Sequence, residues 1–267
     1  MKITTVIPSH GLRSTLADAV NSACEADEVF VLDTVGDAHA SAVRDVCAII
    51  RAPDRGMSGN WNQCFGGGAG EWLHILHDDD VVLPGFYNSV RCAPADRVVA
   101  CAAGYTNVDA ATGRTPFRQQ YTAVLGHTVA GIGAPLQIGS GHLLGWLTRG
   151  NPFRPSSVVM RRDVARDHPF PDVGANDWLM WLRLASIGDW WINPSIMARM
   201  LDGAENDGNR IGAVARSEAV LATIEAAEAW LPRPHHMLMA RDQYAKIAAQ
   251  EGAHEVADRL AMRGVKK

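Results

Sequence analysis

Three consecutive aspartates, Asp78 to Asp80, are the residues of this sequence whose types and spacing most directly suggest chemistry. They follow the apolar run Trp72 to Leu76, and three adjacent carboxylates cannot be buried unpaired without a cost of several kcal/mol. A divalent cation with a diphosphate would remove the repulsion, because Mg²⁺ and Mn²⁺ prefer oxygen ligands. The alternative is a solvated turn before a helix, with Asp80 near the helix N-terminus.

Further polar residues follow other apolar runs in the first part of the chain. Pro8, Ser9 and His10 follow the first run, and Asp33 follows the second. In an open α/β sheet, ligands bind beyond the carboxyl ends of the strands. We therefore expect these residues and the aspartate run to meet at one edge of a sheet and to form a ligand site there.

The elements that must position these residues alternate between short apolar runs and segments of helical period. This order indicates βαβ units and a mainly parallel sheet. The expected strands are Ile3–Ile7, Val29–Leu32, Val46–Ile50, Trp72–Leu76 and Arg97–Cys101. The expected helices are Leu12–Cys24 with Ser14 as its cap, Ala38–Asp45, Gly59–Ala69 and Pro84–Arg91 with proline in the first turn. Gly66 to Gly68 predict an early helix end or a close backbone approach.

The second half of the sequence is less regular. Residues 104 to 155 are rich in glycine and are expected to form strands and loops over the open edge of the sheet. Ser156–Met160 is a further strand candidate, and Asp177–Ile187, apolar almost all round, predicts a buried helix. From about residue 212 the sequence predicts a helical tail that is interrupted at Pro232 and Pro234.

Bulk composition restricts the class of protein. The chain has 267 residues, 47% of them hydrophobic and 20% charged, with a net charge of -4. This balance argues against nucleic acid as a partner, because binding to the phosphate backbone needs a basic surface. Five widely spaced cysteines predict buried thiols in a reducing compartment. The sequence shows no leader peptide and no integral membrane segment, so we expect a cytoplasmic enzyme or one peripheral to a membrane.

Several segments, in this order and at these intervals, resemble family 2 glycosyltransferases. They are VIPSH, VFVLD, MSGNWNQC, GEWLHILHDDDVVLPG and NDWLMWLRLASIGD, and the likeness covers about residues 2 to 200. The resemblance implies an α/β fold of the GT-A type: a nucleotide-binding sheet flanked by helices, with a helical C-terminal tail. The implied domain is 1–211, with a nucleotide-sugar-binding half at about 1–103 and an acceptor-binding half at about 104–211, followed by a helical extension at 212–267.

The resemblance also implies roles for single residues on the donor side. Pro8, Ser9 and His10 would line the nucleotide, with the His10 ring on the base, and Asp33 would hydrogen-bond the base. Asp78 would bind the ribose, and Asn60 would face the donor. Asp79, together with Asp80, would hold Mn²⁺ or Mg²⁺. The implied donor is a UDP- or dTDP-sugar.

On the acceptor side, the resemblance assigns Asp177 as the base of an inverting transfer to an acceptor hydroxyl. The alternative is that Asp177 only caps its helix, which is worth about 1 kcal/mol. The sequence departs from the family at Thr34, His77 and Asn176, where the family often has acids. Two other functions therefore stay open: a sugar-phosphate nucleotidyltransferase and a protein that binds a nucleotide sugar without turnover.

Overall fold

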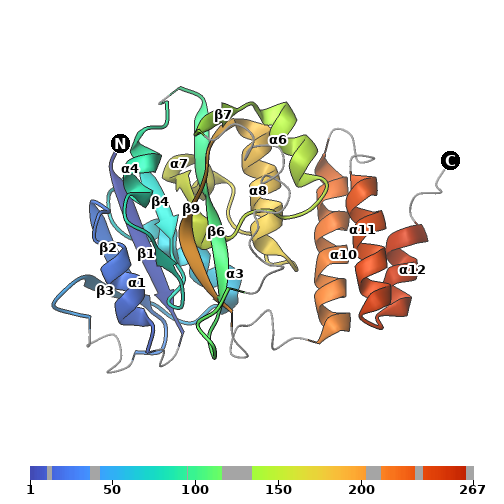
Figure 1. The fold of residues 1–267 in the computed structure, drawn as a ribbon, viewed down its shortest axis with the longest axis horizontal. Coiled ribbons are helices and arrows are strands. Elements are labelled where there is room, and N and C mark those ends of the chain that lie inside the picture. Colours follow the sequence, from blue (N-terminus) through green and yellow to red (C-terminus); the bar gives the residue numbers. More distant parts are fainter. Residues whose placement is uncertain are drawn as a thin grey trace.

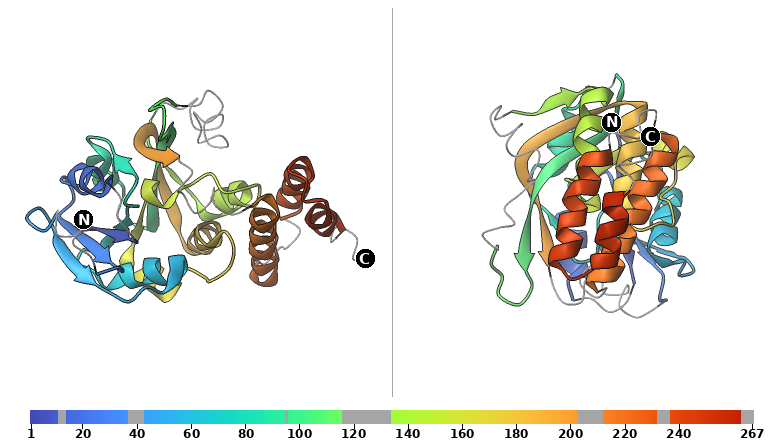
Figure 2. Two further views of the ribbon diagram at one scale, coloured as in Figure 1. Left: turned by 90° about the horizontal axis from the view of Figure 1, so that it is seen from below. Right: turned by 90° about the vertical axis from the view of Figure 1, so that its right-hand side faces the viewer.

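The protein is described by a computed structural model that covers residues 1–10, 14–36, 43–94, 96–115, 134–202, 212–231 and 237–262. A central sheet carries helices on both faces, and three further helices lie together at the C-terminal side (Figure 1). The views in Figure 2 place these three helices at one end of the molecule, away from the first strands. Most of the expected helix Ala38–Asp45, as well as Gly11, Pro232 and Pro234, lies outside the described residues.

The sheet is parallel in its first half and mixed in its second half. Within the described residues it has nine strands in the order β3-β2-β1-β4-β8-β6-β9-β5, with β7 paired to β9. The parallel strands are β1 (Ile3–Ser9), β2 (Glu28–Asp33), β3 (Ala48–Arg51) and β4 (Trp72–Ile75). The remaining strands are β5 (Val81–Val82), β6 (Val98–Asp109), β7 (Leu136–Ile138), β8 (Val158–Arg161) and β9 (Asp189–Asp202). The expected α/β class, with a sheet flanked by helices and C-terminal helices present, is confirmed.

Helix boundaries in the first half differ from the expected ones. The helix α1 (Leu16–Ser22) follows Thr15, and no side chain caps it, so the expected cap at Ser14 is wrong. The helix α4 (Phe86–Arg91) follows Gly85, whose φ is +86°, so Pro84 precedes the helix instead of opening it. Glycine takes this left-handed conformation without strain, and this is why the helix begins after Gly85.

The helix α3 (Gly56–Gln63) begins and ends earlier than expected, and a short 3-10 turn over Cys64–Gly66 follows it. Two glycines of the segment that follows meet strand β1 at close range. A Cβ atom at Gly70 would lie 2.6 Å from the backbone nitrogen of Thr4, and Gly68 has a φ of +69°. The early helix end and the close backbone approach, both expected from the glycine run, are present.

The second half contains elements that the sequence did not predict. The strand β6 continues to Asp109, and the segment expected to be strands and loops includes the helix α6 (Ser140–Leu147). A short 3-10 turn over Pro155–Ser157 leads into β8, so this strand begins later than expected. It is followed by α7 (Arg162–Asp167). Only Leu143 and Leu147 of α6 are buried, which gives too few apolar positions for a clear helical period.

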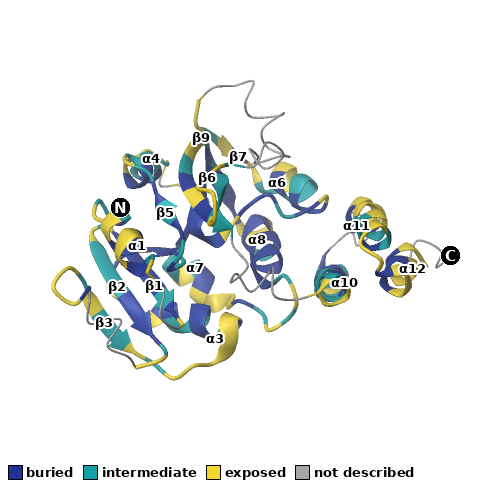
Figure 3. Ribbon diagram, turned by 60° about the horizontal axis from the view of Figure 1, so that its bottom comes forward, coloured by how far each residue is buried: buried dark blue, intermediate teal, exposed yellow. Residues whose placement is uncertain are grey.

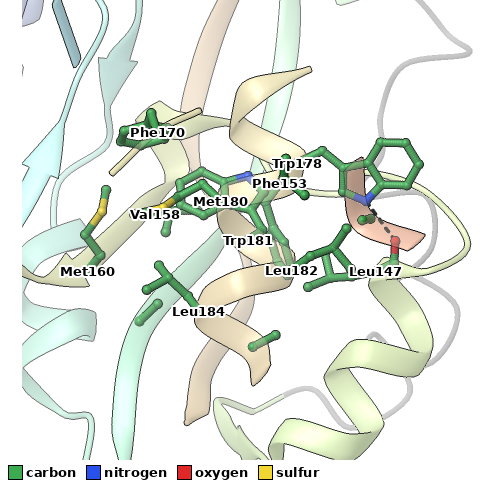
Figure 4. Packing of buried hydrophobic residues seen from close by; sticks show 14 of the residues in the cluster. Leu147, Phe153, Val158, Met160, Phe170, Trp178, Met180, Trp181, Leu182 and Leu184 are labelled. Atoms are coloured by element: carbon green, nitrogen blue, oxygen red, sulfur yellow. Dashed lines mark hydrogen bonds between the residues drawn. The ribbon is translucent and has the colours of Figure 1, made fainter. Parts of the chain in front are cut away.

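The helix α8 (Asn176–Ile187) is buried on nearly every side, as its sequence predicted. Figure 4 shows Trp178 and Trp181 on different sides of this helix. The Trp178 indole donates through Nε1 to the backbone oxygen of Leu147 at 2.8 Å, and Trp181 packs edge-on against Phe170. These contacts fix α8 between the sheet and α6, and therefore fix its N-terminus as well.

The C-terminal helices are α10 (Ala213–Trp230), α11 (Leu238–Gln250) and α12 (His254–Met262). Leu221 and Ile224 of α10 are buried in the same apolar cluster as α8 (Figure 3). No described helix is long and apolar enough to cross a membrane. Of the cysteines, Cys64 and Cys101 are buried and Cys47 is half-buried. Cys24 and Cys92 are exposed, so the expectation of buried thiols is wrong for these two.

Candidate functional site

The ends of β1, β2 and β4 bring the predicted donor-side residues to one edge of the sheet. Ser9 and Asp33 pair across β1 and β2, and β4 lies on the other side of β1. The Ser9 hydroxyl donates to Asp78 Oδ2 at 3.1 Å, and the Thr15 hydroxyl donates to the backbone oxygen of Asp78 at 2.8 Å. Strand topology thus makes neighbours of residues that are far apart in the sequence, while Pro8 lies within β1 and is half-buried.

An open hollow lies beyond the end of β2, and we call it the Asp33 hollow. It is lined by Asp33, Thr34, Val35, Gly36, Arg51, Ala52 and Pro53. Asp33 Oδ1 accepts from the backbone N–H groups of Val35 at 3.1 Å and Gly36 at 2.8 Å. Asp33 Oδ2 is buried and has no hydrogen-bond partner among the described residues, and Arg51 Nη2 lies 4.0 Å from it. A buried carboxylate oxygen without a partner is uncommon, and a ligand N–H would satisfy it.

His10 and Asn60 lie at the rim of the Asp33 hollow. The His10 ring is exposed, with Nδ1 3.4 Å from Thr34 Oγ1 and 3.5 Å from Asp54 Oδ2. The buried Asn60 amide donates to Asp54 Oδ1 and accepts from the backbone N–H of Arg55, both at 2.9 Å. Asn60 therefore uses its amide to hold the loop that carries Asp54, and its role toward the donor stays a prediction.

The three aspartates of the run have different surroundings. Asp78 and Asp80 are buried, and Asp79 is half-buried. Both oxygens of Asp80 are bonded, because Oδ1 accepts from the backbone N–H of Leu201 at 3.0 Å and Oδ2 accepts from the Ser156 hydroxyl at 2.6 Å. Burial raises the pKa of Asp80 to about 6, with His77 lowering it and Asp79 raising it. Asp80 thus connects the loop after β4 to β9 and to the turn before β8.

His77, which replaces an expected acid, lies where it could join a metal site. One ligand atom each from His77, Asp79 and Asp80 lies within 4.8 Å of the others. The His77 ring stacks on Trp61 at 5.3 Å, and its Nε2 is buried without a hydrogen-bond partner in the described part of the chain. One imidazole and two carboxylates are a suitable ligand set for a divalent transition ion. His77 departs from the family pattern in the sequence, but a histidine beside acids is itself a signal of a metal site.

Asp177 lies in the first turn of α8, whose N-cap is Ala175 and which has no side-chain cap, so the expected cap at Asp177 is wrong. Its Oδ1 accepts from the backbone N–H of Trp178 at 2.7 Å, and its Oδ2 accepts from Asn151 Nδ2 at 2.9 Å. Burial raises the pKa of Asp177, although Arg154, Asn151, the Trp178 N–H and His77 lower it. His77 is thus close enough to Asp177 for its charge to affect the pKa of Asp177.

Arg154 is the other charged group on this side of the site. The residue is exposed, and its pKa is raised, because Tyr105, Asp177 and Asp80 raise it by more than desolvation lowers it. Of the other residues that could contact an acceptor, Trp178 belongs to the core, Trp146 is half-buried, and His142 and Arg149 are exposed.

Two residues that hold the site were not found in the sequence. Asn151 bonds Asp177 across 26 positions, and Ser156 bonds Asp80 across 76 positions. Contacts at such separations leave no periodic signal in the sequence.

No family model and no curated protein matches this sequence, but solved structures do match its fold. A mannosyltransferase from Pyrobaculum calidifontis, solved in complex with GDP-Man and Mn²⁺, is 17% identical with a TM-score of 0.64, over 100% of this chain and 76% of that chain. Residues 1–349 of TarS from S. aureus, in complex with UDP-GlcNAc, are 11% identical with a TM-score of 0.62, over 98% of this chain and 88% of that chain. At these identities the likeness establishes a shared fold.

Proposed function

We propose that this protein is an inverting glycosyltransferase that moves a sugar from a UDP- or dTDP-sugar to an acceptor hydroxyl with Mn²⁺ or Mg²⁺. The proposal is carried by the buried carboxylate of Asp177, together with the cluster of His77, Asp79 and Asp80, whose His77 affects the pKa of Asp177. The two proteins of the same fold bind nucleotide sugars, and one of them binds Mn²⁺ as well.

The proposed reaction gives Asp177 the role of general base. Its carboxylate takes the proton of the acceptor hydroxyl as the hydroxyl oxygen attacks the anomeric carbon, and the bond from that carbon to the diphosphate breaks on the opposite side. A bound divalent cation would offset the charge on the departing diphosphate. The hydrogen bonds from Asn151 and from the Trp178 N–H aim the two oxygens of Asp177, and its raised pKa makes it a stronger base than an exposed aspartate.

The two oxygens of Asp33 differ in their hydrogen bonding, and this difference favours a pyrimidine base. Two backbone N–H groups occupy Oδ1, which leaves Oδ2 as the oxygen that has no hydrogen-bond donor among the described residues. The Watson–Crick edge of uracil or thymine offers one N–H between two carbonyl groups, whereas guanine offers two adjacent donors that fit a carboxylate with both oxygens open. Asp33 therefore favours UDP or dTDP over GDP. In this proposal the His10 ring stacks on the base, and Asp78 binds the ribose.

Thermal unfolding with nucleotides tests the proposal. We expect UDP or dTDP with Mn²⁺ to raise Tm, because a ligand at about 100 times its Kd stabilises the folded state by about 2.7 kcal/mol. GDP should have a smaller effect. If no nucleotide shifts Tm in a metal-dependent way, donor binding is excluded, and a larger shift with GDP would contradict the argument from Asp33.

An Asp33→Asn variant sharpens this test. The two backbone N–H groups require the amide oxygen of Asn at the Oδ1 position, so the amide NH₂ would point into the Asp33 hollow. It would meet the imide N–H of uracil donor to donor, but it would pair with the N3 acceptor of cytosine. We expect the preference to move from UDP to CDP, with the exposed Asp18→Asn as the matched control.

The non-catalytic alternative has one observation in its favour, which is that Asp177 also stabilises the first turn of α8 by accepting from the Trp178 N–H. Release of UDP from UDP-glucose separates the two functions, because a binding protein would shift Tm without releasing UDP.

A further inference from the structure

We propose that the C-terminal helices complete the site, with Thr223 of α10 and Tyr244 of α11 as positioning residues for Asp177. The inference rests on the proposed function, which makes Asp177 the base. It gives a role to a part of the chain that carries none of the donor-side residues.

Thr223 holds the chain just before Asp177. It is fully buried, and its hydroxyl accepts from the backbone N–H of Ala175 at 2.9 Å while donating to the backbone oxygen of Ala219 at 3.0 Å. Gly174 meets the same turn of α10, since a Cβ atom there would lie 1.9 Å from the Ala219 oxygen. Only glycine fits at this contact, so the segment that leads into α8 packs directly against α10.

Tyr244 contacts the loop that hydrogen-bonds Asp177. Its ring packs against Trp178 with 5.5 Å between ring centroids, and its hydroxyl lies beside the loop backbone at Gly150 and Asn151, 3.7 Å from where a Cβ atom of residue 150 would lie. The side chain of Asn151 in turn donates to Asp177 Oδ2 at 2.9 Å. Tyr244 therefore lies against two residues next to Asp177. One is Trp178, which follows Asp177 in α8, and the other is Asn151, which hydrogen-bonds the Asp177 carboxylate.

These contacts converge on one carboxylate. The donor to Asp177 Oδ1 belongs to the first turn of α8, and the donor to Oδ2 belongs to the loop of residues 148–154. The first turn of α8 contacts α10, and the loop contacts α11. Loss of either contact would let the carboxylate move relative to the acceptor hydroxyl. A misplacement of about 1 Å can reduce a rate by up to about 100-fold.

The test compares Tyr244→Phe and Thr223→Val with the wild type. Both substitutions keep the shape of the side chain and remove its hydroxyl. Asp242→Asn, at an exposed position of α11, is the matched control. Hydrogen exchange of backbone amides is measured first, since it needs no turnover. We expect faster exchange at residues 147–154 in Tyr244→Phe and at residues 174–178 in Thr223→Val, with no change at residues 28–33.

The second measurement is UDP release from UDP-glucose with Mn²⁺ as a function of pH. We expect the rate at saturating donor to fall on the order of tenfold in both variants, with unchanged affinity for UDP. In Tyr244→Phe the acid limb of the profile should move to higher pH, because the Asn151 hydrogen bond lowers the pKa of Asp177 and would be weakened. A loss of folding would instead reduce the affinity for UDP.

The outcomes are distinguishable. Wild-type exchange at residues 147–154 and 174–178 in both variants would overturn the inference, whether or not UDP-glucose is hydrolysed. If both variants keep the wild-type rate of UDP release and the wild-type pH profile while Asp177→Asn loses most of its activity, the inference is overturned and the proposed function stands. Full activity of Asp177→Asn would overturn the base assignment and the inference with it.

Discussion

Asp177 has contacts both within its own helix and outside it. Its Oδ1 accepts from the Trp178 N–H in the first turn of α8, and its Oδ2 accepts from Asn151, so a bond within the helix and a role in the site do not exclude each other. The carboxylate is buried, which raises its pKa, and it lies near the positive charge of Arg154. Whether Asp177 is a base or only stabilises its helix, the protein should fold after replacement of Asp177 by Asn, because Asn is also favourable at a helix start.

The Asp177→Asn variant therefore separates catalysis from folding. We expect UDP release from UDP-glucose to fall by about 10²- to 10⁴-fold, because a positioned general base contributes about that much, while the affinity for UDP with Mn²⁺ stays unchanged. The wild-type rate should rise with pH through a pKa above the usual aspartate value, since the base acts only when deprotonated and burial raises its pKa. A variant with the wild-type rate would show that stabilising its helix is the only role of Asp177.

His77 carries a prediction on metal choice. Imidazole nitrogen is a better ligand for Mn²⁺ than for Mg²⁺, which prefers oxygen. We expect His77→Phe, which keeps a ring to stack on Trp61, to weaken Mn²⁺ binding at least about tenfold, or about 1.4 kcal/mol, and to affect Mg²⁺ less. Titration followed by electron paramagnetic resonance would measure bound Mn²⁺, with the exposed His142→Phe as control. Equal Mn²⁺ affinity in His77→Phe and wild type would remove His77 from the ligand set.

At the scale of elements, a buried hydrogen-bond network connects β1, β4, α4 and the turn before β8. The Thr5 hydroxyl donates to the Tyr87 hydroxyl at 2.9 Å, and His74 Nδ1 lies 3.0 Å from the same oxygen. His74 Nε2 lies 3.1 Å from the backbone oxygen of Ser156. This pattern requires the proton on Nε2, so that Nδ1 accepts from Tyr87. The network supports Ser156, whose hydroxyl bonds Asp80.

This network predicts acid sensitivity of folding. Burial lowers the pKa of His74 to about 4, whereas histidine in the unfolded chain has a pKa of about 6.5. Between these values the unfolded state binds the extra proton, so the free energy of unfolding should fall as pH drops from about 6.5 to about 4, by up to about 3 kcal/mol. Urea unfolding at several pH values would measure this change.

The His74→Gln variant isolates this contribution. Its amide can still donate toward Ser156 but does not titrate, so the fall in the free energy of unfolding below pH 6.5 should be smaller than in the wild type. An equally steep fall in both proteins would mean that other groups cause the acid sensitivity.

At the scale of the whole molecule, one apolar cluster runs through both the sheet and the C-terminal helices. It includes Val6 of β1, Trp181 of α8, Ile224 of α10 and Leu260 of α12, all of them buried. A second cluster on the other face of the sheet contains Leu16 of α1. The division into residues 1–211 and 212–267 remains a proposal, and the shared cluster argues that the two parts depend on each other for stability.

The shared cluster predicts a single unfolding transition. Ile224→Ala should lower the free energy of unfolding by about 2 to 5 kcal/mol, because it leaves a cavity between α10 and the rest of the core. Circular dichroism reports on all helices, and the eight tryptophans report mainly on residues 61 to 230. The two signals should shift together in the variant. Separate transitions would show that α10 to α12 unfold as an independent unit.

The sequence by itself determined the parallel half of the sheet, the buried helix α8 and the position of the acidic residues at the strand ends. These features follow from local rules, since apolar period distinguishes strand from helix, and a polar residue directly after a buried strand has to lie at the sheet edge. Asp33 and Asp78 could therefore be named from the sequence as a candidate site, whereas Asp177 was named only through the resemblance to a family.

Only the tertiary structure decided what each of these groups is bonded to. Asp80 is tied to Leu201 across 121 positions, and the loop before α8 is tied to Thr223 of α10. The tertiary structure also decided that backbone N–H groups occupy Oδ1 of Asp33. It likewise placed Tyr244 beside Asn151, and His77 beside Asp79. A hydrogen bond depends on distances and directions that arise when distant segments pack together, and no local pattern of residue types records them.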